Sequence, residues 1–171
     1  KVERLYVESG CDVKRELYVA MLVDRASSQL LLILSAHGGQ DIEKTAAEHP
    51  GSINRLPVDL HDGPRDEAVA ASLAQFALPD DQADRIQQII GSMFRMFTSL
   101  DASLIEINPL AITRQGDVLA LDAVVSFDDN ALFRHPDIRD LRDDSQLPPG
   151  QLRAITHGIN YVKLDGDIGY M

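Results

Sequence analysis

The segment LIEINPL, residues 104–110, is followed after a short turn by LALDA, residues 119–123. Alternate side chains of a strand point to opposite faces, so Glu106 and Asn108 share one face and the two isoleucines of the first segment occupy the other. In the second segment, Asp122 alternates with leucines in the same way. The two segments therefore predict an antiparallel β-hairpin with one apolar face and one face that carries polar groups.

The length of the turn decides whether the polar groups of the two strands meet. If residues 114–116 form a three-residue loop with Gly116 in the left-handed conformation, Asn108 lies directly opposite Asp122. A two-residue loop would shift the register by one residue and place them on opposite faces. The geometry of a site at this hairpin thus depends on Gly116.

An amide and a carboxylate at opposed positions have Cβ atoms about 4.5–5.5 Å apart and can reach one cation between them. Mg²⁺ commonly takes one or two such protein oxygens and completes its shell with water and phosphates. Glu106 could add a third oxygen or orient a water molecule. The spacing alone leaves a second interpretation open, in which Asn108 caps a turn before Pro109 and Asp122 is a solvated edge residue.

The rest of the chain alternates between strand-like and helix-like segments. The clearest helical periodicity is in Asp81–Leu100, where apolar side chains recur every three or four residues and predict a helix packed on a sheet. Other predicted segments are a hairpin (Leu17–Val23, Leu30–Ser35), helices (Asp41–His49, Arg65–Leu78), an edge strand (Ile53–Leu60), the second hairpin (Ser103–Thr113, Asp117–Ser126), a connector (Phe127–Gly150) with a short helix near Asp137–Arg142, and a final strand (Tyr161–Leu164).

The composition limits the partners and the compartment. The 171 residues carry a formal net charge of -11, which argues against nucleic acid or an anionic membrane surface as the main partner. Cys11 is the only cysteine, so an internal disulfide is impossible, and no apolar run approaches the roughly 20 residues needed to cross a bilayer. We therefore expect a soluble protein of a reducing compartment. Both ends of the sequence have the look of cut ends.

The sequence resembles the β subunit of succinyl-CoA synthetase and its relatives, malate-CoA ligase and ATP-citrate lyase. The resemblance rests on several separate motifs in the same order along the whole chain, which make it specific. The matching residues are Val7–Glu8, Glu16–Val19, Asp24–Arg25, Glu106–Leu110, Leu121–Ala123, Phe127–Arg134 and Tyr161–Met171.

The resemblance implies an α+β fold, the C-terminal part of an ATP-grasp domain with a largely antiparallel sheet. This ATP-grasp subdomain is expected over residues 1–130, a connector over 131–159, and the first strand of a flavodoxin-like CoA-ligase domain over 160–171. The same resemblance matches Asn108 and Asp122 to the two Mg²⁺ ligands of the family, and Glu8 and Glu16 to residues that contact the nucleotide base and ribose. It puts Glu8 at the end of one strand and Glu16 at the start of the next.

The reaction implied by the resemblance joins succinate to CoA at the expense of ATP or GTP and releases succinyl-CoA, nucleoside diphosphate and phosphate. It proceeds through a phosphohistidine on a partner α subunit, in a bacterial cytoplasm or a mitochondrial matrix. Two alternatives stay open: a malate-CoA ligase, and a non-catalytic acidic assembly module with a vestigial metal pair. The chain by itself, as an internal fragment, is expected to be inactive.

Some positions depart from the family pattern and leave the substrate preference and the exact family membership undecided. His37 stands where a glutamate commonly precedes the pair Gly38–Gly39, and Val124 replaces a lysine. The five histidines show no ligand spacing and are interpreted as surface or turn residues, so no phosphohistidine is assigned to this chain. No P-loop with its lysine is present, which argues against a Walker-type NTPase.

Overall fold

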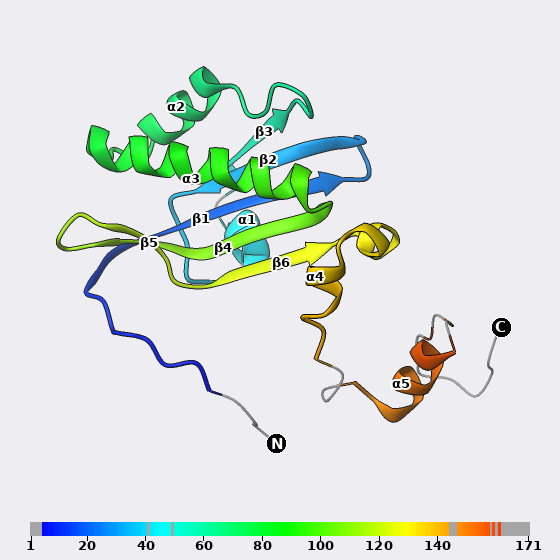
Figure 1. Ribbon diagram of the computed structural model, residues 1–171. Helices are drawn as coiled ribbons and strands as arrows, with labels where there is room; N and C mark the ends of the chain where they lie inside the picture. The colour runs from blue at the N-terminus through cyan, green and yellow to red at the C-terminus, as the bar shows by residue number, and fades with distance from the viewer. Residues whose placement is uncertain are drawn as a thin grey trace. The chain divides into compact units, whose positions relative to one another are not determined.

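A sheet covered on one face by two helices forms the main body of the protein (Figure 1). The computed structural model describes residues 5–40, 42–48, 50–143, 147–157, 159 and 161. It contains two compact units, Lys1–Ala131 and Leu132–Met171. None of the helices in the described part of the chain is both long and apolar enough to span a membrane.

The sheet belongs to the first unit and has the order β3-β2-β1-β4-β5, with β6 also paired to β4. All of its paired strands are antiparallel. The long central strands β1 and β4 therefore form its middle, and the short strands form its edges. The strands are β1 (Val13–Asp24), β2 (Gln29–Ser35), β3 (Ile53–Val58), β4 (Ala102–Thr113), β5 (Val118–Ala120) and β6 (Ala123–Phe127).

The first predicted hairpin is confirmed, because Asp24 pairs with Gln29 and the ladder runs on to the pair of Tyr18 and Ser35. The predicted edge strand is also confirmed: β3 pairs only with β2 in the described part of the chain. Pro57 lies in β3, where its missing N–H is tolerated because an edge strand has one unpaired side.

Helices α2 (Asp66–Ala74) and α3 (Asp80–Ser99) lie together on one face of the sheet (Figure 1). The predicted helix over Arg65–Leu78 is shorter in the structure, because Ala77 has a φ of 49° and Pro79 follows. The predicted apolar stripe of α3 is confirmed as its packing face. Side chains that are almost fully buried between helices and sheet are Leu17, Val19, Met21, Leu32, Leu34, Val69, Leu73, Ile86, Ile90, Leu110 and Ile112.

Three further short helical segments lie between or after the strands of the sheet. Helix α1 (Ile42–Glu48) falls within the predicted segment Asp41–His49, and η1 (Pro50–Ser52) separates it from β3. Turn η2 (Asp129–Arg134) follows β6.

The second unit contains α4 (Pro136–Arg139), close to the expected short helix, and α5 (Pro149–Thr156). A connector was predicted in the region of α5, so this helix was not expected. Neither helix has a buried residue, so neither requires a regular apolar stripe in its sequence. Without such a stripe, α5 could not be recognised from the sequence. The strand expected at Tyr161–Leu164, and with it the start of a ligase domain at 160–171, lies outside the described residues except for Tyr161.

Candidate functional site

The turn between β4 and β5 has the predicted three-residue length. Gly116 has a φ of 97°, and its N–H donates to the carbonyl of Thr113 at 3.1 Å. The N–H of Thr113 donates in turn to the carbonyl of Asp117 at 2.9 Å, which makes these two residues the first pair of the hairpin. The register expected from the sequence is therefore confirmed.

This register places Asn108 opposite Asp122. Leu110 pairs with Ala120 on one side of this position and Ile107 pairs with Ala123 on the other, so both flanking ladders keep the same alignment. The N–H of Asn108 donates to the carbonyl of Asp122 at 3.1 Å. The two predicted metal ligands are therefore direct neighbours across the hairpin.

The second strand of the hairpin differs from the expectation in being interrupted. The sequence predicts one strand over Asp117–Ser126, whereas the structure has β5 and β6 separated at Leu121 and Asp122. The interruption lies opposite Pro109, which has no N–H to contribute to the ladder. Asp122 therefore lies at a break in the sheet edge, with an exposed side chain.

The neighbouring strand shows a second irregularity at the same place. Between the pairs Leu17–Leu110 and Val19–Ile107, β4 contributes two residues, Asn108 and Pro109, against the single residue Tyr18 of β1. A β-bulge of this kind changes the direction in which a side chain points, and bulges are frequent next to functional sites. The bulge distinguishes Asn108 from the regular strand positions around it.

The side chain of Asn108 contacts the turn that follows β2. Its Oδ1 accepts a hydrogen bond from the N–H of Gly39 at 2.7 Å, and its Nδ2 donates to the carbonyl of Gln40 at 3.1 Å. A Cβ on Gly39 would overlap the carboxylate of Glu16. The structure thus brings together Asn108 and Glu16, two of the four predicted site residues, on either side of one glycine turn.

Glu106 lies on the same face of β4 as Asn108 and close to Tyr18 of β1. Ala20, two residues along β1 from Tyr18, is the register partner of Glu106. Burial of the ring, and then the negative charge of Glu106, raise the pKa of Tyr18 far above its ordinary value. Tyr18 is only 3% exposed, so it supports Glu106 from beneath the surface.

Glu8 is not placed with the other predicted residues. It lies in an extended segment before β1 that belongs to no strand of the described chain, so its expected position at the end of a strand is corrected. A strand requires hydrogen bonds to a neighbour, and none is recorded for this segment among the described residues. Leu5, Tyr6 and Val7 in the same segment are highly exposed.

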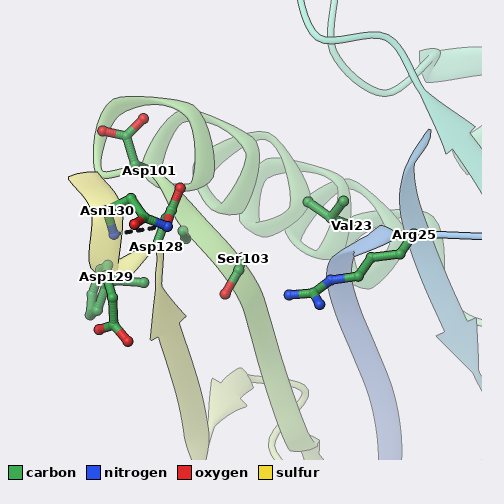
Figure 2. Close-up of a pocket in the computed structure, with 9 residues that line it drawn as sticks. Val23, Arg25, Asp101, Ser103, Asp128, Asp129 and Asn130 are labelled. Carbon is green, nitrogen blue, oxygen red and sulfur yellow. Dashed lines mark hydrogen bonds between the residues drawn. The ribbon is translucent and has the colours of Figure 1, made fainter. Parts of the chain in front are cut away.

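A separate hollow of about 700 Å³ lies between the ends of β1, β4 and β6 (Figure 2). Figure 2 shows Arg25 extending toward Ser103, while Asp101 and the segment Asp128–Asn130 gather on the other side. Asp128 accepts hydrogen bonds from the N–H and Nδ2 of Asn130 at 2.9 and 3.1 Å. The carboxylates that line this hollow outnumber its one guanidinium, so the hollow suits an anionic ligand poorly.

This hollow is distinct from the predicted metal pair. Its β4 residues stand at the start of the strand, and Asn108 lies further along it, roughly 20 Å away at 3.3 Å per residue. Among the residues that the structure describes, no group of three or more His, Cys, Asp and Glu side chains could hold a metal ion. The predicted metal site has only two protein ligands, one amide and one carboxylate, and is therefore not a group of this kind.

The ATP-grasp domain model matches residues 1–112 of the chain, which include β1 to β3, α2, α3 and most of β4. The chain belongs to the ATP-grasp family. Solved structures agree with this fold: ATP citrate lyase from Methanothrix soehngenii, in complex with citrate and coenzyme A, aligns with a TM-score of 0.59 and 22% identity over 80% of this chain and 30% of that chain.

Curated relatives of this ATP-grasp chain carry the name succinate–CoA ligase [ADP-forming] subunit beta. The protein of Paramagnetospirillum magneticum is 44% identical over 171 residues, which are 100% of this chain and 43% of the relative. That of Acidiphilium cryptum is 46% identical over 99% of this chain and 43% of the relative. That of Rickettsia conorii is 43% identical over 100% of this chain and 44% of the relative. The ATP-grasp chain therefore spans less than half the length of these relatives.

Sequence reasoning missed two parts of this region of the ATP-grasp chain. One is Tyr18, which reads as an ordinary strand residue because its partner Glu106 lies on a strand far along the sequence. The other is the turn at Gly38 and Gly39, which was not predicted to contact the site. A pair of glycines directly after a buried strand is a usable signal for close backbone approach.

Proposed function

We propose that this chain is the metal- and nucleotide-holding part of the β subunit of an acid–thiol ligase that forms succinyl-CoA from succinate, CoA and a nucleoside triphosphate. The observation that carries the proposal is the alignment of Asn108 with Asp122 across the hairpin. The similarity to succinate–CoA ligase β subunits along the whole chain supports the reaction class.

The residues present suit Mg²⁺. The amide oxygen of Asn108 has two lone pairs, of which the N–H of Gly39 takes one, so one stays available to a cation. Asp122 offers an exposed carboxylate from the opposed strand position. Oxygen donors of this type are the ligands that Mg²⁺ prefers, and a site with two protein ligands leaves room for phosphates and water.

When bound between these side chains, Mg²⁺ would supply charge neutralisation for the phosphates of the nucleotide. Glu106 would add an oxygen to this face or orient a water molecule. Its carboxylate lies close to Tyr18, whose pKa is raised by burial and then by this negative charge.

Glu16 and Glu8 would hold the nucleoside. Glu16 supports this assignment by its position beside the same glycine turn that contacts Asn108. Glu8 is assigned on resemblance alone. Because the relatives are named ADP-forming, we assign ATP rather than GTP as the nucleotide.

The rest of the reaction requires parts beyond this chain. In this proposal residues 1–130 form the ATP-grasp subdomain, 131–159 a connector, and 160–171 the first strand of a flavodoxin-like ligase domain. CoA, the dicarboxylate and a partner α subunit carrying a phosphohistidine belong to the whole enzyme. A substrate panel on that enzyme separates succinate from malate.

The variant Asp122→Ala tests the metal pair in the full-length protein, meaning the natural gene product with everything that flanks residues 1–171. Because one of two protein ligands is removed, we expect the Kd of the Mn²⁺–ATP complex to rise at least tenfold, with the thermal unfolding temperature nearly unchanged. Electron paramagnetic resonance of free Mn²⁺ measures the Kd.

Asp117→Ala is the matched control, because it removes the same charge from an exposed position in the same hairpin. We expect this variant to leave the Kd unchanged. Equal affinity of the Asp122→Ala variant and the wild type would contradict the catalytic proposal and favour a non-catalytic assembly module.

A further inference from the structure

The turn Gly38–Gln40, between β2 and α1, lies directly against β1. The N–H of Gly38 donates to the carbonyl of Glu16 at 2.9 Å. A Cβ built on Gly38 would overlap the backbone carbonyl of Leu17. No side chain fits between the turn and the strand at this position, so the turn is held at the distance of a backbone contact.

The same turn binds both ends of the Asn108 amide. The N–H of Gly39 faces Oδ1 and the carbonyl of Gln40 faces Nδ2. If the amide were rotated by half a turn, its NH₂ group would face an N–H and its oxygen would face a carbonyl, which are two repulsive contacts. The turn therefore selects one orientation of the amide and keeps the oxygen on the side of Gly39.

Gly39 contacts the other side of the predicted site as well. Its φ of 71° lies in the left-handed region, which favours glycine, and a Cβ at this position would run into the Glu16 carboxylate. The turn thus has Glu16 on one side and Asn108 on the other.

We propose that the turn Gly38–Gln40 is a positioning element of the metal–nucleotide site, which aims the Asn108 oxygen and supports the Glu16 side chain. This inference rests on the proposed function. The physical basis is preorganisation, because a ligand whose orientation is fixed before binding loses less conformational freedom when the cation arrives.

Gly39→Ala tests the inference in the full-length protein. The added Cβ meets the end of a flexible side chain rather than backbone, so the change displaces the turn with less disturbance than an alanine at Gly38. We expect the Kd of Mn²⁺–ATP to rise at least tenfold. Gly51→Ala is the control, because a Cβ at this exposed glycine meets nothing within 4 Å, and its Kd should equal that of the wild type.

A second measurement does not depend on the metal or on the folding of the Gly39 variant. Asn108→Ala removes both hydrogen bonds to the turn, so amide hydrogen exchange of the peptide that carries residues 38–40 should become at least tenfold faster in metal-free protein. The peptide that carries Gly51 should exchange at the wild-type rate. Unchanged exchange at residues 38–40 would overturn the inference whatever the metal affinity.

The two proposals fail in different ways. If Asp122→Ala leaves Mn²⁺–ATP binding unchanged, the proposed metal pair is wrong. If Asp122→Ala weakens binding while a folded Gly39→Ala variant binds like the wild type, the metal pair stands and the role of the turn is wrong.

Discussion

Burial of the ring, and then the neighbouring carboxylate of Glu106 on β4, raise the pKa of Tyr18 on β1. The two residues belong to adjacent central strands of the sheet, and Tyr18 is the residue opposite the bulge formed by Asn108 and Pro109. The buried Tyr18 thus lies next to a carboxylate on the face of β4 that carries Asn108.

The raised pKa of Tyr18 predicts a pH dependence of stability. The folded protein holds the phenolic proton more tightly than the unfolded chain does, so this contribution is complete below the unfolded pKa of about 10 and is lost progressively at higher pH. Tyr18→Phe removes the titrating group. Urea unfolding from pH 8 to 10.5 should show the stability of the wild type falling relative to that of the variant as the pH exceeds about 10. A constant difference would contradict the prediction.

Gly116→Ala should destabilise the hairpin that aligns the metal pair. A Cβ at Gly116 meets only Gln82 Nε2 at 3.6 Å, which is an ordinary contact, so the cost comes from the backbone φ of 97°. We expect a loss of about 1–2 kcal/mol in the free energy of unfolding. Urea denaturation measures it, with Gly10→Ala as the control because a Cβ there has open space. Equal losses in the two variants would refute the strained-turn explanation.

Arg15→Met should loosen the attachment of α2 to the sheet. Arg15 Nη1 donates to the carbonyl of Phe76, just beyond the helix, at 2.8 Å, and the group is half-buried. Methionine keeps much of the aliphatic length and removes the donor, so we expect a loss of about 1–3 kcal/mol. Lys14→Met at the exposed neighbouring position should change the unfolding free energy by less than about 0.5 kcal/mol. Similar losses at both positions would show that the Phe76 contact contributes nothing specific.

Ile86→Ala should leave a cavity between α3 and the sheet. Ile86 is 0% exposed and belongs to the main core cluster. Its truncation should cost about 2–5 kcal/mol, because the surrounding side chains collapse only partly into the space. Thermal unfolding compared with the exposed neighbour Arg85→Ala checks this, and a variant as stable as the wild type would place Ile86 outside the core.

The parts of the fold that local chemistry determines could be predicted from the sequence. The spacing of apolar residues located α3, and the position of Gly116 fixed the register that aligns Asn108 with Asp122. Both features depend on residues close together in the chain. The predictions of an α+β class and of an ATP-grasp domain are also confirmed. The ATP-grasp prediction came from the motif resemblance rather than from periodicity.

The parts that depend on distant segments could not be predicted. The bulge at Asn108 arises from pairing with β1, and the contact of Gly39 with Asn108 joins a turn and a strand that lie far apart in the sequence. Neither leaves a periodic signal. Glu8 shows the converse: the family resemblance predicts a strand that ends at this residue, but the segment does not form a strand because it pairs with no neighbour among the described residues.

The shortness of β5 and β6 and the proline of β3 have a consequence for association between molecules. A long, regular outer strand offers a row of unpaired N–H and C=O groups on which another chain can add a strand. Here one border of the sheet is divided at Leu121 and Asp122, and the other contains Pro57, which has no N–H to offer. The break at which Asp122 lies exposed thus also makes this border a poor template for intermolecular strand addition.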